Sequence, residues 1–352
     1  MHLNGASNPI RTLALLSRLT RTSISNRCSL RRLLLIARSR VPMLSLAVAV
    51  LASCAAPQVQ PAAPGAAAKA LYSRSSVAPK TRENNLLYLS DVQTNAVAVY
   101  SYPQGKLLAR LTNFQRPRGE CADANGDVWI ADAGTYQVVE YAHGGTQPIA
   151  ALSTPNAPHG CSVDPTTGNL AVTGAADRGG VFVYRYSEHG QWRDPRQYGG
   201  SAIRNAYFCG YDASGNLFVD GLAAGGLFGL AELPRRGSAL VNVSLNQAIK
   251  APGQIQWDGQ HIAVGDAGTA PSTIYQFSVT GSHASEVGTT TLKGSTSVRQ
   301  FWIEGNTVVG PDFNRDVALW EYPSGGSPTK KIALLGYGAA ISLAPHGRSV
   351  RP

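Results

Sequence analysis

Charged residues are scarce in this chain, at 15% of 352 residues, against roughly 25% in an average soluble domain. The sequence contains no phosphate-binding loop, no nucleophile elbow and no His-Glu-x-x-His motif, so the common signatures of nucleotide, serine-hydrolase and zinc-protease chemistry are missing. Glycine and proline, by contrast, number 37 and 21. Because these residues mark turns, the composition favours an all-β fold of short strands.

Acidic residues and lysine are both absent from residues 1–53, which hold eight arginines. The whole chain has a net charge of +10, so the rest carries only +2. The positive charge is therefore concentrated near the N-terminus, and a basic groove for a phosphate backbone is not supported. We expect no nucleic-acid partner.

The apolar run at residues 41–53 is too short to span a bilayer comfortably and has the length of a signal-peptide core. It follows several arginines and ends in Leu51-Ala52-Ser53-Cys54, which resembles the lipobox of bacterial lipoproteins. That resemblance implies a lipid on the Cys54 thiol and a membrane-tethered protein of the cell envelope, periplasmic or at the cell surface. An ordinary cleaved secretory signal is the alternative, and translation starting near Leu30 would explain the long upstream stretch.

Three regions follow from this pattern: an N-terminal extension and signal at 1–53, an Ala/Pro-rich tether at 54–85, and a folded domain at 86–352. The tether has no hydrophobic periodicity and cannot build a core. Within the folded domain, Cys121, Cys161 and Cys209 are expected to be small buried side chains without a partner. A Cys161–Cys209 bridge stays open as an alternative, because both cysteines occupy similar points of neighbouring repeats.

A unit of a little over forty residues repeats from Leu86 onward. Each unit has an apolar second strand, a third strand with alternating polarity and a weaker outer strand, and all but the first begin with an inner strand. The apolar strands end, at spacings of 41, 42, 46, 46 and 46, in Asp91, Asp132, Gly174, Asp220, Asp266 and Asp312. We predict a six-bladed β-propeller of four-stranded antiparallel blades. Residues 338–345 supply the inner strand that the first unit lacks, so the C-terminal strand should close the first blade.

The segments RPRGECADANGDVWIAD (116–132) and APHGCSVDPTTGNLAVTG (157–174) carry the clearest motif, Pro-x-Gly followed by an Asp-containing turn and a strand. This motif resembles the NHL-repeat and YncE-like class of propellers. The resemblance covers residues 86–345 and implies a fold rather than a chemistry. The turn Asp and Gly residues are interpreted as structural, because they cap backbone amides and supply positive φ.

Ligands of propellers usually bind at the mouth of the central channel, where the inner strands begin. The candidate mouth residues are Arg118, Glu120, His159, Asn205, Gln254 and Arg299. Glu120, Asn205 and Asp266 would be the ligands of Ca²⁺ or another divalent metal in an SMP-30/gluconolactonase-like lactonase, although a single carboxylate at the mouth is a poor set for such an ion. His159 beside Glu120 would suit the general base of a streptogramin-lyase-like propeller, but that family has seven blades.

The sequence favours a binding module over an enzyme, with no cofactor and no catalytic residue assigned. Its ligand is left open among an envelope protein, a glycan and a small molecule, and we expect a monomer. The polar stretch at residues 186–200, which includes Trp192 and Tyr198, is the most elaborate loop and a second place for such contacts. A metal-dependent propeller lactonase, or a related hydrolase or lyase, is the alternative function.

Overall fold

The computed structural model describes residues 85–176, 179–187, 190–200, 203–313, 316–333 and 336–342. All of them belong to one compact unit, Ala62–Pro352. The predicted signal, the tether up to residue 84 and the lipidation candidate Cys54 lie outside the described residues. Within the described part of the chain, no helix is long and apolar enough to cross a bilayer.

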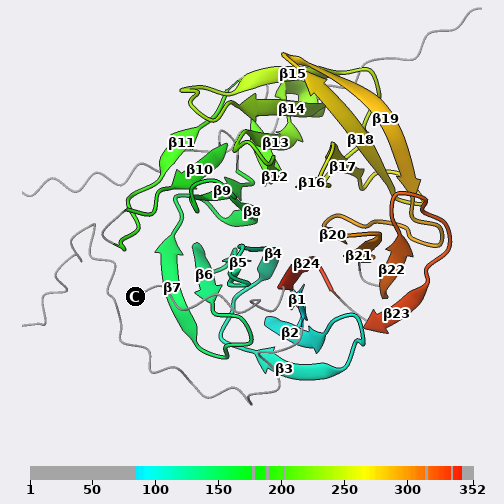
Figure 1. Cartoon of the computed structure of the whole chain (residues 1–352). Helices are drawn as coiled ribbons and strands as arrows, with labels where there is room; N and C mark the ends of the chain where they lie inside the picture. Colours follow the sequence, from blue (N-terminus) through cyan, green and yellow to red (C-terminus); the bar gives the residue numbers. More distant parts are fainter. Residues whose placement is uncertain are drawn as a thin grey trace, which may run out of the picture. The chain divides into compact units, whose positions relative to one another are not determined.

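The described chain is an all-β propeller in which antiparallel sheets surround a common centre (Figure 1). The first sheet, in the order β24-β1-β2-β3, contains β1 (Leu86–Asp91), β2 (Ala96–Ser101), β3 (Leu107–Leu111) and β24 (Gly338–Ser342). The second sheet contains β4 (Pro117–Ala122), β5 (Val128–Asp132), β6 (Gln137–Tyr141) and β7 (Pro148–Ser153). The third sheet contains β8 (Pro158–Val163), β9 (Leu170–Gly174), β10 (Val181–Tyr184) and β11 (Arg196–Tyr198).

An eight-stranded sheet and a last four-stranded sheet complete the described structure. The former contains β12 (Asn205–Tyr211), β13 (Leu217–Leu222), β14 (Phe228–Leu233), β15 (Val241–Leu245), β16 (Pro252–Trp257), β17 (Ile262–Asp266), β18 (Thr273–Thr280) and β19 (His283–Thr291). The latter contains β20 (Trp302–Glu304), β21 (Thr307–Pro311), β22 (Val317–Glu321) and β23 (Lys330–Ala333). A single 3-10 turn, η2 (Ala224–Gly226), precedes β14.

The C-terminal strand closes the first sheet, as the sequence predicts. β24 pairs antiparallel with β1, with Leu86 opposite Ser342 and Ser90 opposite Gly338. The two ends of the described chain therefore meet in one sheet, and β1 has no free edge. The predicted residues 343–345 of this strand lie outside the described residues.

The core lies between neighbouring sheets, which explains the continuous apolar runs of the second strands. One cluster joins Leu86 and Tyr88 of β1 to Val128 and Ile130 of β5. Strands β5, β9 and β17 are buried at every residue. A strand covered on both faces has no polar face, so its sequence does not alternate. The outer strands β7 and β15 are more exposed, and each has one buried residue, Leu152 or Val243.

The eight-stranded sheet contains a pairing that the sequence did not indicate. β15 runs parallel to β19, with Ser244 opposite His283 and Leu245 opposite Ala284. β19 begins at His283, and the β18–β19 hairpin thereby covers part of the outer edge of β15, which would otherwise present unpaired backbone groups.

The strand-ending aspartates have the structural role that the turn chemistry predicts. Asp132 accepts the backbone N–H of Gln115 at 2.8 Å, and Asp312 accepts those of Thr296 and Ser297. In each case the carboxylate holds the loop that leads into the inner strand of the same sheet, β4 or β20. These aspartates therefore fix where the inner strands begin.

The cysteines correct the sequence prediction. Cys121 on β4 and Cys161 on β8 form a disulfide, with their Cα atoms 5.6 Å apart. Cys209 on β12 is the buried free cysteine. The expectation of three unpaired cysteines is wrong for two of them, and the alternative Cys161–Cys209 bridge is wrong as well.

The physical reason is the direction of the side chains around the ring. The Cys161 sulfur lies 3.7 Å from the carbonyl oxygen of Trp129 in the preceding sheet, and the Cys209 sulfur lies 4.0 Å from that of Ala171 in its own preceding sheet. Equivalent positions of successive sheets thus point the same way and cannot meet. Cys121 is offset by one residue, because it pairs with Trp129 whereas Glu120 pairs with Ile130, and it faces the following sheet.

Candidate functional site

A pocket of about 260 Å³ lies where several inner strands begin near the centre of the propeller. It is bordered by β8, β12, the start of β16 and the segment before β20, which surround the centre in Figure 1. Its lining residues are His159, Tyr207, Phe208, Leu222, Lys250, Ala251, Pro252, Ala267 and Arg299. We call this cavity the mouth pocket.

Strand register places equivalent residues of successive repeats around this pocket. The residues opposite the ends of the second strands are Pro117, Pro158, Pro252 and Val298, which pair with Asp132, Gly174, Asp266 and Asp312. The residues that follow them are Arg118, His159, Gly253 and Arg299. This position carries no acidic side chain in any of the four repeats.

The glycine of the Pro-x-Gly motif allows the inner strands to approach closely. A Cβ atom on Gly119 would lie 2.5 Å from the carbonyl oxygen of His159, and one on Gly160 would lie 3.1 Å from that of Tyr207. A side chain at Gly119 would therefore push β4 away from β8. The motif glycine brings the preceding residue of each strand, Arg118 or His159, to the centre.

His159 is fixed as a neutral, fully hydrogen-bonded imidazole. Its Nδ1 lies 3.0 Å from the carbonyl oxygen of Tyr207, and its Nε2 lies 2.9 Å from the hydroxyl of Tyr337. A carbonyl can only accept, so Nδ1 carries the proton and Nε2 accepts from Tyr337. Burial, together with the nearby charges of Arg118 and Arg299, lowers the pKa of His159 to about 3. Both ring nitrogens are occupied, so His159 has no free base to offer.

Three cationic side chains surround this histidine. Arg299 and Lys250 line the mouth pocket, and Arg118 is close enough to act on the pKa of His159. None of the three forms an ion pair with a carboxylate of the described residues. The Arg299 guanidinium lies 4.7 Å from the ring centre of Phe313, which packs edge-on against Tyr337. The lining of the pocket therefore combines two cationic side chains with aromatic and apolar ones.

Glu120 is not part of the mouth. Its side chain is fully buried, neither carboxyl oxygen has a hydrogen-bond partner, and burial raises its pKa well above the usual value. Burial also raises the pKa of Tyr88 on β1, and the charge of Glu120 raises it further. The strand register shifts between Pro117 and Glu120, so Arg118 and Glu120 do not share a face as regular alternation would require.

The remaining predicted residues have separate positions. The backbone N–H of Gln254 donates to the carbonyl oxygen of Arg299 at 2.7 Å, which joins β16 to the segment carrying that arginine. Asn205 pairs with Leu222 at the edge of the pocket, and its buried Oδ1 has no partner. Asp266 accepts the backbone N–H groups of Lys250 and Ala251.

Residues of the two catalytic alternatives have other surroundings. Among the described residues, no group of three or more His, Cys, Asp or Glu side chains could hold a metal ion. Asp266 accepts backbone N–H groups, and the buried Glu120 carboxyl group forms no hydrogen bond to His159. His159 donates to and accepts from other groups, and the carboxyl group of Glu120 lacks any hydrogen-bond partner.

Sequence reasoning missed Lys250, Tyr207 and Tyr337. Two of them could have been found by aligning the repeats, because Tyr207 occupies the place of His159 in the segment YFCGYD and Lys250 precedes the Ala-Pro-Gly that matches Ala-Pro-His-Gly. Tyr337 had no such signal. It reaches His159 only because β24 returns from the far end of the chain to the first sheet.

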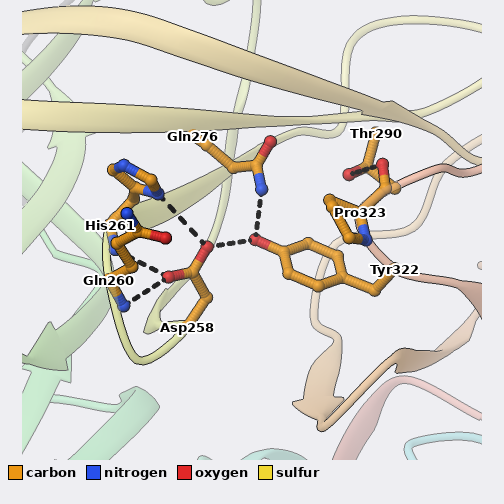
Figure 2. A network of polar contacts seen from close by, with 7 residues as sticks. All are labelled: Asp258, Gln260, His261, Gln276, Thr290, Tyr322 and Pro323. Atoms are coloured by element: carbon orange, nitrogen blue, oxygen red, sulfur yellow. Dashed lines mark hydrogen bonds and ion pairs between the residues drawn. The ribbon is translucent and has the colours of Figure 1, made fainter.

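A second pocket of about 610 Å³ lies at the edge of the eight-stranded and last sheets. Figure 2 shows its polar network, in which the Tyr322 hydroxyl donates to Asp258 at 2.6 Å and accepts from Gln276 at 3.1 Å. The backbone N–H groups of Gln260 and His261 also donate to Asp258. These groups are hydrogen-bonded to one another, so we interpret the network as structural. We call it the Tyr322 latch, because it joins the β16–β17 turn to the end of β22.

No protein-family model and no curated protein sequence matches this chain. Solved structures do. A chain of a nidogen/laminin complex matches with a TM-score of 0.59 and 13% identity, covering 74% of this chain and 100% of that one. A protein of unknown function from Bacteroides caccae matches with a TM-score of 0.55 and 12% identity, covering 74% and 99%. Hydrazine synthase from Kuenenia stuttgartiensis matches with a TM-score of 0.54 and 11% identity, covering 75% and 88%. At these identities the likeness establishes the β-propeller fold alone.

Proposed function

We propose that this protein is an exported propeller that binds a small ligand in its mouth pocket and does not catalyse a reaction. The observation that carries this proposal is the state of His159, the candidate base at the pocket. Both of its nitrogens are used in holding Tyr207 and Tyr337, so it shapes the pocket instead of moving a proton.

The finer fold proposal is six blades of the NHL-repeat and YncE-like type. The eight-stranded sheet supports it, because the pairing between its halves is limited to Ser244–His283 and Leu245–Ala284. Each half is a four-stranded antiparallel sheet, β12–β15 and β16–β19. Two blades joined at their outer strands then add to the four separate sheets.

We also propose that the protein is a lipoprotein of the bacterial cell envelope, anchored through Cys54 and monomeric. The Cys121–Cys161 disulfide supports an oxidising compartment. Replacing Cys54 by Ala should move the protein from the membrane fraction to the soluble fraction and remove the mass of the lipid. An unchanged mass and an unchanged membrane fraction would contradict the anchor.

Filling the mouth pocket tests the binding function. Ala267 lines the pocket, so Ala267→Trp should abolish binding of any ligand found by thermal-shift screening of the purified protein against sugars, sugar acids and sugar phosphates. The matched control is Ala213→Trp, in the exposed turn between β12 and β13. If Ala267→Trp stays folded and keeps the ligand, the mouth pocket is not the binding site.

Metal content separates this proposal from the lactonase alternative. A stoichiometric divalent ion in the purified protein, together with lactone turnover that is lost on chelation, would favour the enzyme. We expect the melting temperature to be the same before and after chelation, because the described carboxylates do not converge.

A further inference from the structure

The mouth pocket has an excess of positive charge that no described side chain neutralises. Lys250 and Arg299 line it, Arg118 lies near His159, and none of the three pairs with a described carboxylate. Like charges gathered without counterions repel one another, and their repulsion is relieved when an anion binds between them.

Two buried carboxylates bind backbone N–H groups of pocket residues and form no ion pair with the three cations among the described residues. Asp266 is buried, and it accepts the backbone N–H groups of Lys250, Ala251 and Gly268, not the Lys250 ammonium. Asp220 is also buried and accepts those of Phe208 and Gly253, and burial raises its pKa well above the usual value. Both acids are thus committed to holding the loops behind the pocket wall.

The wall is also organised before any ligand arrives. Arg299 is held against Phe313, and the backbone N–H of Gln254 binds the Arg299 carbonyl. His159 is locked between Tyr207 and Tyr337 and adds no charge of its own. A guanidinium held in this way loses little freedom on binding, which favours an oxyanion with two oxygens that can each accept an N–H group.

The size of the pocket limits the ligand. Its volume of about 260 Å³ is below the roughly 300–1,000 Å³ typical of sites for drug-sized molecules. A single carboxylate or phosphate group on a small polar body fits this space, whereas a polymer could insert only one residue.

We propose that the mouth pocket binds a small oxyanion ligand, one that carries a carboxylate or a phosphate group, between Arg299 and Lys250, with Arg118 adding to the attraction. This inference rests on the proposed binding function of the same pocket. It excludes neutral sugars and cations as the principal ligands.

Calorimetric titration of the full purified protein at low salt tests it with matched probes. Glucose 6-phosphate and gluconate carry the two oxyanion groups, and glucose is the neutral control. We expect one or both anions to bind at least about tenfold more tightly than glucose. Binding should weaken as salt is raised, because mobile ions screen the charges.

Charge variants then assign the site. Arg299→Gln and Lys250→Gln should each weaken anion binding by about tenfold or more, while Arg299→Lys, which keeps the charge, should lose less. Arg236→Gln removes the same charge at an exposed position after β14 and should bind like the unmodified protein. Melting temperatures confirm that each variant is folded.

The outcomes separate this inference from the proposed function. If glucose binds as tightly as the anions, and only Ala267→Trp abolishes binding, the pocket is a ligand site but the oxyanion inference is overturned. If an anion binds and Ala267→Trp leaves it bound, both proposals fail. If neither anion binds the unmodified protein more tightly than glucose, the oxyanion inference is overturned.

Discussion

Glu120 occupies a position that the neighbouring sheets fill with Cys161, Cys209 and Ile255, which pair with equivalent residues of the second strands. Those side chains suit an apolar space between sheets, and a carboxyl group without a hydrogen-bond partner does not. Burial therefore raises the pKa of Glu120 well above its usual value, and burying this carboxyl group without a partner costs stability.

Replacing Glu120 by Met should stabilise the fold. Methionine has a similar length and no polar atom that needs a partner, so the free energy of unfolding in urea should rise by about 1–3 kcal/mol at pH 7. Glu321→Met, at an exposed position of β22, is the control and should change little. A loss of stability in Glu120→Met would mean that the carboxyl group has a stabilising role in the folded protein.

Two other acids of the sheet β4–β7 and its turns, Glu140 and Asp127, should make the free energy of unfolding depend on pH. Burial, with added repulsion from other acids, raises the pKa of Glu140 to about 8 and that of Asp127 to about 6. The folded state keeps these protons to higher pH than the unfolded chain, whose carboxyl groups titrate near about 4. Their stabilising contribution is fully present below that pH and is lost as pH rises towards 8.

The free energy of unfolding should accordingly fall between pH 5 and pH 8, and Glu140→Gln should reduce that slope. Asp258 should change the free energy of unfolding in the opposite direction at acid pH. Burial alone would raise its pKa, but hydrogen bonds from Tyr322 and the backbone lower it, so its contribution is lost on acidification. Urea titrations at several pH values provide the measurement, and stability rising from pH 5 to pH 8 would contradict the assignment.

At the scale of the strands and turns, specific side chains join neighbouring sheets. Gln300 is fully buried, and its side-chain amide donates to the carbonyl oxygen of Glu120 at 2.6 Å and accepts the N–H of the same residue at 3.2 Å. The disulfide ties β4 to β8, and the Tyr322 latch ties β22 to the β16–β17 turn. Each joint crosses a boundary between sheets, where no backbone ladder exists.

Tyr322→Phe should weaken one of these joints without changing its shape. It removes the hydrogen bonds to Asp258 and from Gln276 and should lower the free energy of unfolding by about 1–3 kcal/mol, because both groups lose a buried partner (Figure 2). Tyr136→Phe alters a hydroxyl on a side chain that is 53% exposed and should be near neutral. Equal free energies of unfolding for the two variants in urea would show that the hydrogen bonds of Tyr322 do not stabilise the fold.

At the scale of the whole molecule, closure by β24 determines whether the propeller has free edges. Deleting residues 338–352 would expose the edge of β1, which pairs with β24 from Leu86 to Ser90. We expect the truncated protein to aggregate or to be recovered as insoluble material. Deleting only residues 346–352, beyond the predicted closing strand, should leave it soluble. A soluble, monomeric 1–337 protein would contradict the role of β24.

The order and position of the strands could be predicted from the sequence because each is set locally. The runs ending at Asp91, Asp132 and Asp266 became β1, β5 and β17 with the expected ends, since apolar runs between turn residues leave few other solutions. Even the closing strand at Gly338 was predictable, because the first unit lacked an inner strand.

The candidate site was predictable only in part. His159 and Arg299 line the mouth pocket, and Arg118, at the equivalent place of its repeat, acts on the pKa of His159. Glu120 does not line the pocket, because the irregular register after Pro117 turns it to the other side of β4. The charge of the mouth pocket depends on that turn, since it removes the one acid that the sequence placed there.

The sequence by itself thus determined the repeat, the strands and the residues that begin each inner strand, because hydrophobic pattern and turn chemistry act over a few neighbouring residues. Only the tertiary structure decided that Cys121 pairs with Cys161, that β15 joins β19, and that Tyr337 reaches His159. These contacts depend on which way a side chain points around the ring and which sheets lie side by side. Such information exists only once the ring has closed.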